Sequence, residues 1–433
     1  MIKLKEISKY IKLLDDFYKS IVFKSISLKF LESIIIFIIS LIVIRYLGPT
    51  DYGKLNYIFS IITILRPIYI FGMPGVLQAK LSRNKRSKVL INQLITIQFS
   101  LFIGVSTLAI FLLRKVFLFE DFSLFIILQL AFGFRLFDLF TQSLFIFNKG
   151  LESLKINLIS AIKLLILISI VWKLNLGITA VALAYLINYS TDLISIDRIL
   201  NSNNLYSIFF KIKLNFRNLN NNLKKGFPLA ASGLIAMILQ KSDVIFITYF
   251  LGIYSSGIYS APCTLVFKIS VFLNLITLNL IPSLNHEFSR NMDKKSIKLY
   301  FYTWFISFFA AITFYFLGPL IISYGFGDEY KESLKLIPLF SLVIFFNGLK
   351  ITANAFLNFY NFENIIFRKA LISILINIFL NIILIPNFGL NGVLISLLVS
   401  TIFNAVGGYL FNKDLKNHYR NLIFPDLRYL FSN

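Results

Sequence analysis

The sequence contains little charge, a single cysteine and no nucleotide-binding loop. Only 15% of its 433 residues are charged, and its mean hydropathy is +0.78. Soluble domains carry about 25% charged residues, so a water-soluble globular protein is excluded. Cys263 has no second cysteine with which to form an intrachain disulfide. The G-x-x-x-x-G-K-[ST] loop is missing, and a bound nucleoside triphosphate is therefore not expected as the energy source.

Apolar blocks of about twenty residues fill most of the sequence. This is the length of a helix that crosses a bilayer, whereas membrane β-strands give alternating blocks of about ten. We therefore predict an all-α integral membrane protein with twelve transmembrane helices. The predicted spans are residues 30–47, 55–77, 89–113, 122–147, 156–173, 178–199, 227–251, 261–284, 299–322, 334–357, 366–386 and 388–411.

Positive charge is concentrated on one side of these spans. Thirty of the 43 Lys and Arg residues lie in the N-terminal segment, the C-terminal tail and the connections after even-numbered spans. Seven lie in the opposite connections. Because basic connections stay in the cytoplasm, we predict that both termini are cytoplasmic. The asymmetry also accounts for most of the net charge of +23, so nucleic acid is not expected as a partner.

Candidate catalytic groups are few. His286 and His418 both fall in predicted cytoplasmic segments, where neither can join a metal site or a triad at the outer face. The paired carboxylates Asp15-Asp16 and Asp328-Glu329 fit solvated segments. We expect no catalytic residue, no metal site and no cofactor, and hence no enzyme.

The N-terminal segment, residues 1–29, does not look like a cleaved signal. Its basic residues are spread from Lys3 to Lys24, and no uninterrupted apolar region precedes a cleavage site. Apolar residues recur at helical spacing against lysines, as in a helix that lies on an anionic leaflet. A basic tail that sets the topology is the other interpretation.

Three short motifs recur in the same order about two hundred residues later. LGPTDYG at 47–53 returns as LGIYSSG at 251–257, SRN at 82–84 returns at 289–291, and NLG at 175–177 returns as NFG at 387–389. This indicates two six-helix halves. Because six is even, the halves are parallel, and many transporters enclose a central cavity between such halves. The predicted organisation is a basic N-terminal segment 1–29, a first half 30–200, a cytoplasmic linker 201–226, a second half 227–411 and a tail 412–433.

The motif RYLGPTDYG at 45–53, followed by Phe71-Gly72 before a basic loop, resembles the start of the O-antigen and capsular polysaccharide flippases. These belong to the multidrug/oligosaccharidyl-lipid/polysaccharide exporter superfamily. Similar segments of the second half are KSD at 241–243, GIYSA at 257–261, FGDEY at 326–330 and PNFGLNG at 386–392. The resemblance implies a bacterial inner-membrane flippase that moves polyprenyl-diphosphate-linked oligosaccharides to the outer leaflet.

Six cations lie inside the predicted spans, namely Arg66, Arg135, Lys163, Lys241, Lys268 and Lys350. A cation at the centre of a membrane helix costs about 2.5–3.5 kcal/mol, so these side chains are expected to face protein or water. Asp138 is placed to form a structural pair with Arg135, three residues before it. Lys241 and Asp243 are two residues apart and point to different sides of their helix, so each needs another partner.

The ligand that suits such cations is a diphosphate that carries sugars. We predict that Arg66, Lys241 and Lys268, together with Arg135 and Lys163, bind this headgroup while the polyprenyl tail stays in membrane lipid. Pro67 and Pro74 predict a broken helix beside Arg66, as in many transporter substrate sites. A purely structural role for these cations is the alternative.

Energy is expected from an ion gradient or from the membrane potential, which would drive the two halves to rock. Asp243 is the candidate ion or proton site, with Asn377 and Asn381 as polar neighbours one helical turn apart. The structural alternative is that these asparagines form hydrogen bonds between helices.

Two other functions compete with the flippase. A drug/cation antiporter of the same superfamily would favour carboxylates over cations in its spans. A membrane polysaccharide polymerase would need a large outer loop, and the longest here has about ten residues. The partners expected for a flippase are the lipid-linked oligosaccharide and membrane lipid, with a polysaccharide polymerase and chain-length proteins as further candidates.

Overall fold

The computed structural model describes residues 21–81, 88–114, 119–146, 149–202, 219–281, 284 and 294–423. Nine helices in this part of the chain are long and apolar enough to cross a membrane. Three of them, α2, α10 and α13, contain a non-helical glycine, and α2 alone would be ~75 Å long if straight. Each of the three therefore crosses a bilayer of ~30 Å twice. This confirms the predicted all-α membrane protein with twelve crossings.

Several sequence predictions concern residues outside the described part. These are the amphipathic helix before residue 21, both SRN motifs, Asp15-Asp16, His286 and residues 203–218 of the linker.

The chain forms two compact units. The first contains Met1–Val43 and Leu65–Gly233, and the second contains Ile44–Ile64 and Leu234–Asn433. This division departs from chain order, because residues 44–64 pack within the second unit. There, the Tyr330 hydroxyl donates to the Ile44 carbonyl at 3.1 Å, and Tyr52 and Thr264 share a hydrogen bond of 2.9 Å. The halves 30–200 and 227–411 rest on the repeat and stay a prediction.

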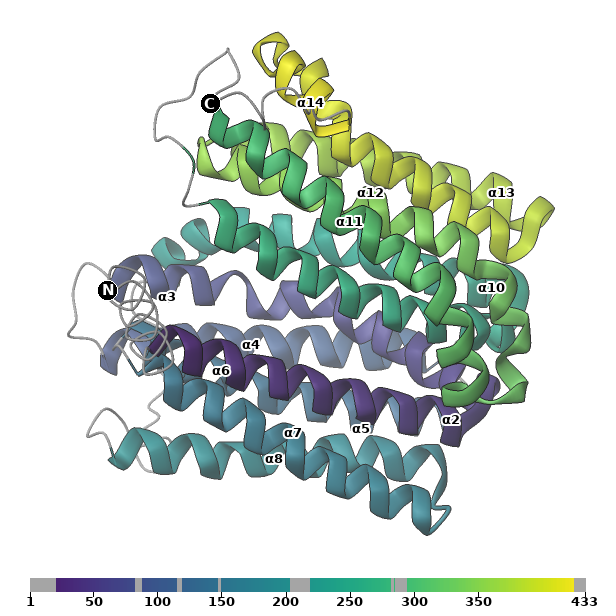
Figure 1. Cartoon of the computed structure of the whole chain (residues 1–433). Coiled ribbons are helices and arrows are strands. Elements are labelled where there is room, and N and C mark those ends of the chain that lie inside the picture. Colours follow the sequence, from purple (N-terminus) through teal and green to yellow (C-terminus); the bar gives the residue numbers. More distant parts are fainter. Residues whose placement is uncertain are drawn as a thin grey trace, which may run out of the picture. The chain divides into compact units, whose positions relative to one another are not determined.

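The first unit is a bundle of helices around an apolar core. Its helices are the flanks of α2 (Ile21–Ile70), α3 (Met73–Leu81), α4 (Lys88–Leu113), α5 (Phe119–Phe134), the 3₁₀ turn η1 (Arg135–Phe137), α6 (Asp138–Ile146), α7 (Gly150–Lys173), α8 (Gly177–Ser202) and the start of α10 (Leu219–Leu280). Helices α7 and α8 lie side by side as a hairpin in Figure 1. Buried residues of α3, α4 and α6, including Leu77, Leu94 and Phe140, form the core.

Two predicted spans of the first unit are interrupted. The second span does not break at Pro67, because helical backbone continues to Ile70 and the break falls at Phe71 and Gly72, with φ of 48° and 65°. The fourth span contains the 3₁₀ turn Arg135–Phe137. In a 3₁₀ turn, residues i and i+3 are eclipsed, so this turn aligns Arg135 with Asp138.

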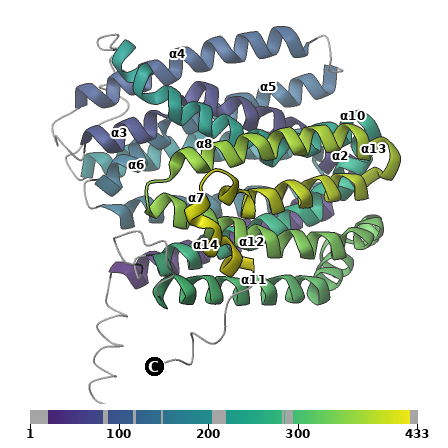
Figure 2. The ribbon, with the colours of Figure 1, turned by 90° about the horizontal axis from the view of Figure 1, so that it is seen from above.

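The second unit contains the middle of α2 and most of α10. The elements that follow are α11 (Lys294–Leu320), the π-helical turn η3 (Ile321–Phe326), η4 (Asp328–Leu336), α12 (Ile337–Phe359), α13 (Glu363–Val406), η5 (Gly407–Leu410), η6 (Lys413–Leu415) and α14 (Lys416–Ile423). Figure 2 shows α13 doubling back beside α12. The aromatic side chains of Tyr300, Phe356 and Tyr419 belong to one buried cluster at the α14 end.

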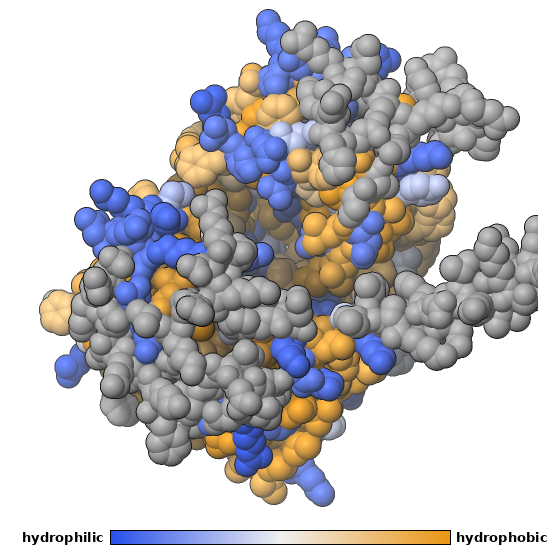
Figure 3. Space-filling model, turned by 90° about the vertical axis from the view of Figure 1, so that its left-hand side faces the viewer, coloured by the Kyte–Doolittle hydropathy of each residue, from blue (hydrophilic) through white to orange (hydrophobic). Residues whose placement is uncertain are grey.

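Large apolar side chains cover the outside of both units. Phe111, Phe316 and Phe379 are 69%, 67% and 63% exposed, which suits contact with lipid chains and not with water. In Figure 3, the face toward the viewer shows hydrophilic residues of the described part beside hydrophobic surface.

The repeated motifs occupy equivalent turns. Gly48 and Gly252, which the repeat aligns, have φ of 66° and 85° and interrupt α2 and α10. Gly177 and Gly389 are aligned likewise, with φ of 82° and 57°. Residues with a Cβ rarely adopt this backbone, so each turn depends on glycine. The recurrence of conformation at matching positions supports the internal repeat.

A second glycine of the same motif makes a close backbone crossing within the second unit. A Cβ added at Gly53 would overlap the carbonyl oxygen of Ile253, and one added at Gly257 would overlap that of Pro49. The two repeat copies thus touch through backbone atoms, at a spacing that only glycine allows.

We expect Gly257→Ala to destabilise the protein by about 1–3 kcal/mol, because the added methyl group meets rigid backbone and not a flexible side chain. The measurement is thermal unfolding in detergent micelles. Gly104→Ala is the matched control, since a Cβ there meets nothing within 4 Å. An equal unfolding temperature for the two variants would contradict the close crossing.

Candidate functional site

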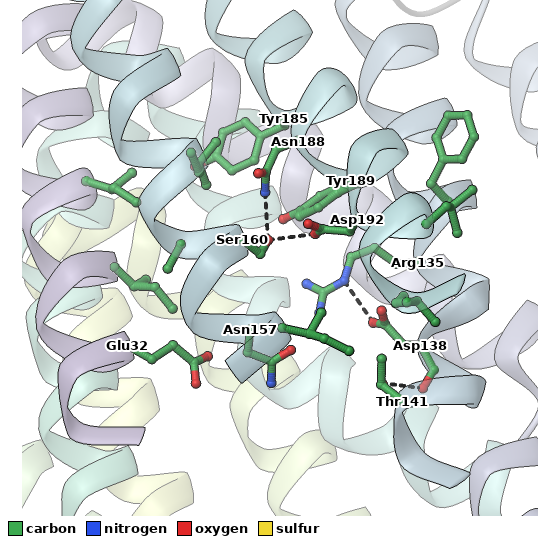
Figure 4. A pocket seen from close by; sticks show the side chains of 18 of the residues that line it. Glu32, Arg135, Asp138, Thr141, Asn157, Ser160, Tyr185, Asn188, Tyr189 and Asp192 are labelled. Carbon is green, nitrogen blue, oxygen red and sulfur yellow. Dashed lines mark hydrogen bonds and ion pairs between the residues drawn. The ribbon is translucent and has the colours of Figure 1, made fainter. Parts of the chain in front are cut away.

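A polar pocket of about 410 Å³ lies inside the first unit (Figure 4). Helices α2, α5, α6, α7 and α8 and the turn η1 supply its walls. Its lining includes charged residues, amides, hydroxyls and two tyrosines, together with apolar residues such as Ile39 and Leu164. Polar and charged groups around a space of this size are costly among lipid-facing helices, so the pocket is a candidate binding site.

Arg135 is held by a carboxylate and by an aromatic ring. Its Nε donates to the Asp138 carboxylate at 2.9 Å, and its guanidinium lies 5.0 Å from the centre of the Tyr189 ring. Arg66 approaches the same carboxylate at 3.7 Å. The structural pair expected for Arg135 and Asp138 is therefore present, and Arg66 shares it.

Lys163 is also paired. Its ammonium group donates to the Asp192 carboxylate at 2.6 Å and to the Thr191 hydroxyl at 3.0 Å. Ser160 donates to the other oxygen of Asp192 at 2.6 Å, and Asn188 donates to Ser160 at 2.9 Å. Two helices thus form one polar network around a partly buried ion pair.

Sequence reasoning missed Asp192, although a signal for it was present. Helices α7 and α8 form a tight hairpin whose turn ends at Gly177. Lys163 precedes this glycine by fourteen residues and Asp192 follows it by fifteen, so antiparallel packing places them opposite one another. Glu32, which contacts Lys29 at 2.9 Å at the pocket, was missed as well.

A separate buried site lies in the second unit, around Asp243. Asn381 donates its side-chain N–H to one oxygen of this carboxylate at 2.8 Å, and the Tyr259 hydroxyl donates to the other at 3.2 Å. The Asn381 side-chain N–H also donates to the side-chain oxygen of Asn377 at 3.2 Å, and the Ser242 hydroxyl donates to the same oxygen at 3.4 Å. The structure thus brings the three predicted residues Asp243, Asn377 and Asn381 together. Tyr259 was not foreseen.

This carboxylate has no cation to pair with in the described part of the chain. Asp243 is 2% exposed, and it accepts hydrogen bonds from Asn381 and Tyr259. Among the described residues, the buried side-chain oxygen of Asn381 has no hydrogen-bond partner. A buried carboxylate beside an unsatisfied amide oxygen offers oxygen ligands to a small cation or a site for a proton.

The remaining predicted cations belong to the second unit. Lys241 is half-buried on α10, and the described residues give it neither an ion pair nor a hydrogen bond. In particular, it does not pair with Asp243, as expected from their spacing. Lys268 lies further along α10 and Lys350 lies on α12, and both are half-buried. Arg66, Arg135 and Lys163 belong to the first unit.

Lys369 lies near the start of the predicted span 366–386. Helix α13 already begins at Glu363, so Lys369 is helical, and it is fully buried. Within the described part of the chain, its ammonium group has no hydrogen-bond partner, and it lies 5.8 Å from the centre of the Tyr419 ring on α14. The like charge of Lys350 also repels it. The helical position agrees with the predicted span, whereas the burial of this lysine was not predicted.

His418 packs against buried aromatic side chains. Its ring lies 4.8 Å from that of Phe356, and its Nδ1 is 3.4 Å from the Tyr300 hydroxyl. No metal-binding group of three or more His, Cys, Asp or Glu residues occurs in the described ranges.

Together, these features define a multi-pass membrane protein with a transporter fold. The solved structure of the lipid II flippase MurJ, in an inward closed conformation, matches 93% of this chain and 91% of that chain, with a TM-score of 0.73 and 17% identity. An inward-facing multidrug resistance MATE family transporter matches with a TM-score of 0.65 and 13% identity, over 90% of this chain and 96% of that chain. At these identities the likeness shows the fold alone, which this chain shares with those two transporters.

The family is given by sequence. A family model described as polysaccharide biosynthesis protein matches residues 21–288, and the chain belongs to this family. A capsular polysaccharide biosynthesis protein of Staphylococcus aureus, CapF, is 26% identical over 334 residues, which is 72% of this chain and 79% of the relative. The family resemblance drawn from the sequence motifs is confirmed.

The pairing of Lys163 with Asp192 predicts unequal effects of single and double substitutions. Lys163→Met should lower the free energy of unfolding by about 2 kcal/mol, because it leaves a partly buried carboxylate without its cation. The double variant Lys163→Met, Asp192→Leu should recover most of this loss. Thermal unfolding in detergent micelles tests both, and additive losses would show that the pair contributes nothing.

Proposed function

We propose that this protein is a flippase for polyprenyl-diphosphate-linked oligosaccharide repeat units. It moves them from the cytoplasmic to the outer leaflet of a bacterial inner membrane, for the synthesis of a surface polysaccharide such as O-antigen or capsule. The observation that carries the proposal is a polar pocket within the lipid-facing helices of a polysaccharide biosynthesis family member. The concentration of Lys and Arg in one set of connections supports a topology with both termini in the cytoplasm.

The cations divide into two groups in this mechanism. Arg135 and Lys163 are engaged by Asp138 and Asp192, so they position the pocket walls. The proposed contacts to the diphosphate are Arg66, Lys241 and Lys268, of which Lys241 has no competing carboxylate among the described residues. Lysine acts on a phosphate as a point charge, and arginine can bind it with two N–H groups, so both residue types can contact a diphosphate.

Alternating access needs an energy source, which is an ion gradient or the membrane potential in this proposal. The Asp243 site is the proposed place where that gradient or potential acts on the protein. A coupling ion or proton bound by Asp243, Asn377 and Asn381 would change the charge of a buried group, and so change which conformation is favoured. The site is made by α10 and α13, so occupancy acts on the packing of two helices.

The drug antiporter is the less favoured alternative. A cationic drug needs a free negative charge in its pocket. The three carboxylates that line the pocket, Glu32, Asp138 and Asp192, are each paired with a lysine or arginine. Drug sensitivity measured beside glycan export separates the two functions.

Lys241→Met should reduce glycan export at least tenfold while the protein remains in the membrane at its normal level. The charge is removed without breaking an ion pair, so loss of export would reflect the substrate and not the fold. The measurement is surface polysaccharide in cells together with flipping in proteoliposomes. Lys173→Met, at the exposed end of α7, is the control. Normal export by Lys241→Met would contradict the assigned contact.

Asp243→Asn should uncouple transport from its driving force. Amide and carboxylate have the same shape, so folding is retained while the charge that binds the ion or proton is lost. In proteoliposomes, we expect wild-type flipping to accelerate with a Na⁺ gradient, a pH gradient or a voltage, and the variant to ignore it. Wild-type transport indifferent to all three would remove the coupling role.

A further inference from the structure

The charges around the pocket of the first unit nearly cancel. Lys29 pairs with Glu32, Arg135 pairs with Asp138, and Asp192 pairs with Lys163. Each of the three carboxylates that line the pocket is therefore neutralised by a cation. A diphosphate with about two negative charges would have to compete with carboxylates that are already in place at 2.6–2.9 Å.

The hydrogen-bonding capacity left open in the pocket is uncharged. The side-chain oxygen of Asn188 is buried and finds no hydrogen-bond partner among the described residues, while its N–H group donates to Ser160. Asn157 also lines the pocket, and its side-chain amide makes no hydrogen bond to the described residues. Both side chains lie on the pocket wall in Figure 4. A pocket wall that carries uncharged amides favours a ligand with O–H or N–H groups over a ligand that carries charge.

The other walls of the pocket suit a ring with apolar faces. Tyr185 and Tyr189 line it on α8, with ring centres 6.0 Å apart, and Ile36 and Ala161 add aliphatic surface. A pyranose presents hydroxyls around its rim and C–H groups on its faces. The pocket volume of about 410 Å³ falls within the usual range for small-molecule sites, about 300–1,000 Å³.

We propose that this pocket binds a neutral sugar residue of the transported glycan, through Asn157 and Asn188, and does not bind the diphosphate. The inference rests on the proposed function and adds to it a separate site for the sugar. Because an unpaired buried amide penalises a ligand that lacks the matching hydroxyl or amide, the pocket would select which glycan is moved.

The test uses purified full-length protein in nanodiscs of phosphatidylethanolamine and phosphatidylglycerol. Three probes are compared: bare polyprenyl diphosphate, and the same lipid with one hexose or with one N-acetylhexosamine. We expect the wild type to bind at least one glycosylated probe about tenfold more tightly than the bare lipid. Asn157→Leu and Asn188→Leu should lose this advantage and bind the bare lipid as the wild type does.

Controls separate a lost contact from a damaged fold. Replacing Asn157 breaks no hydrogen bond to the described residues, whereas replacing Asn188 removes its hydrogen bond to Ser160. If the Asn188 variant does not fold, the Asn157 variant alone provides the test. Asn279→Leu, on an exposed face of α10, is the matched control and should keep wild-type preference. Equal wild-type affinity for all three probes, or an Asn157→Leu variant that keeps the sugar preference, would overturn the inference and leave the flippase proposal standing. A wild type that neither binds nor flips any glycosylated lipid would overturn both.

Discussion

A charge within a bilayer must be met by other groups of the protein, and this constraint organises both units. In the first unit it is met by opposite charge, since each carboxylate of the pocket holds a lysine or arginine from the same or a neighbouring helix. In the second unit it is met by dipoles, since Asp243 is surrounded by an amide and a hydroxyl. These two solutions give the sites different chemistry. Matched charges leave a fixed polar surface, whereas a lone carboxylate retains the capacity to take up a proton or an ion.

Much of the fold could be predicted, because membrane helices are read from length and apolarity. The twelve crossings and the glycine turns at Gly48 and Gly252 followed from span length and from the repeat. The sequence did not reveal the break at Phe71 and Gly72. Pro67, the more familiar breaker, leaves the helix intact, and the interruption depends on two residues in the left-handed region, one of them not glycine.

The candidate site was predicted in part. Asp243, Asn377 and Asn381 were expected to be neighbours and are. Asp192 was not predicted, because its ion pair joins two different helices. The burial of Lys369 was not predicted either. A lysine beside a connection is normally exposed, and only the packing of Tyr419 over it shows otherwise. Contacts between helices require register, which local periodicity does not supply.

The backbone crossing of Gly53 and Gly257 has a consequence for how the two repeat copies can diverge. At this crossing the duplicated motif faces its own counterpart, so a bulkier residue in one copy collides with the main chain of the other. A change at either glycine therefore has to be accommodated by the backbone of both copies at once.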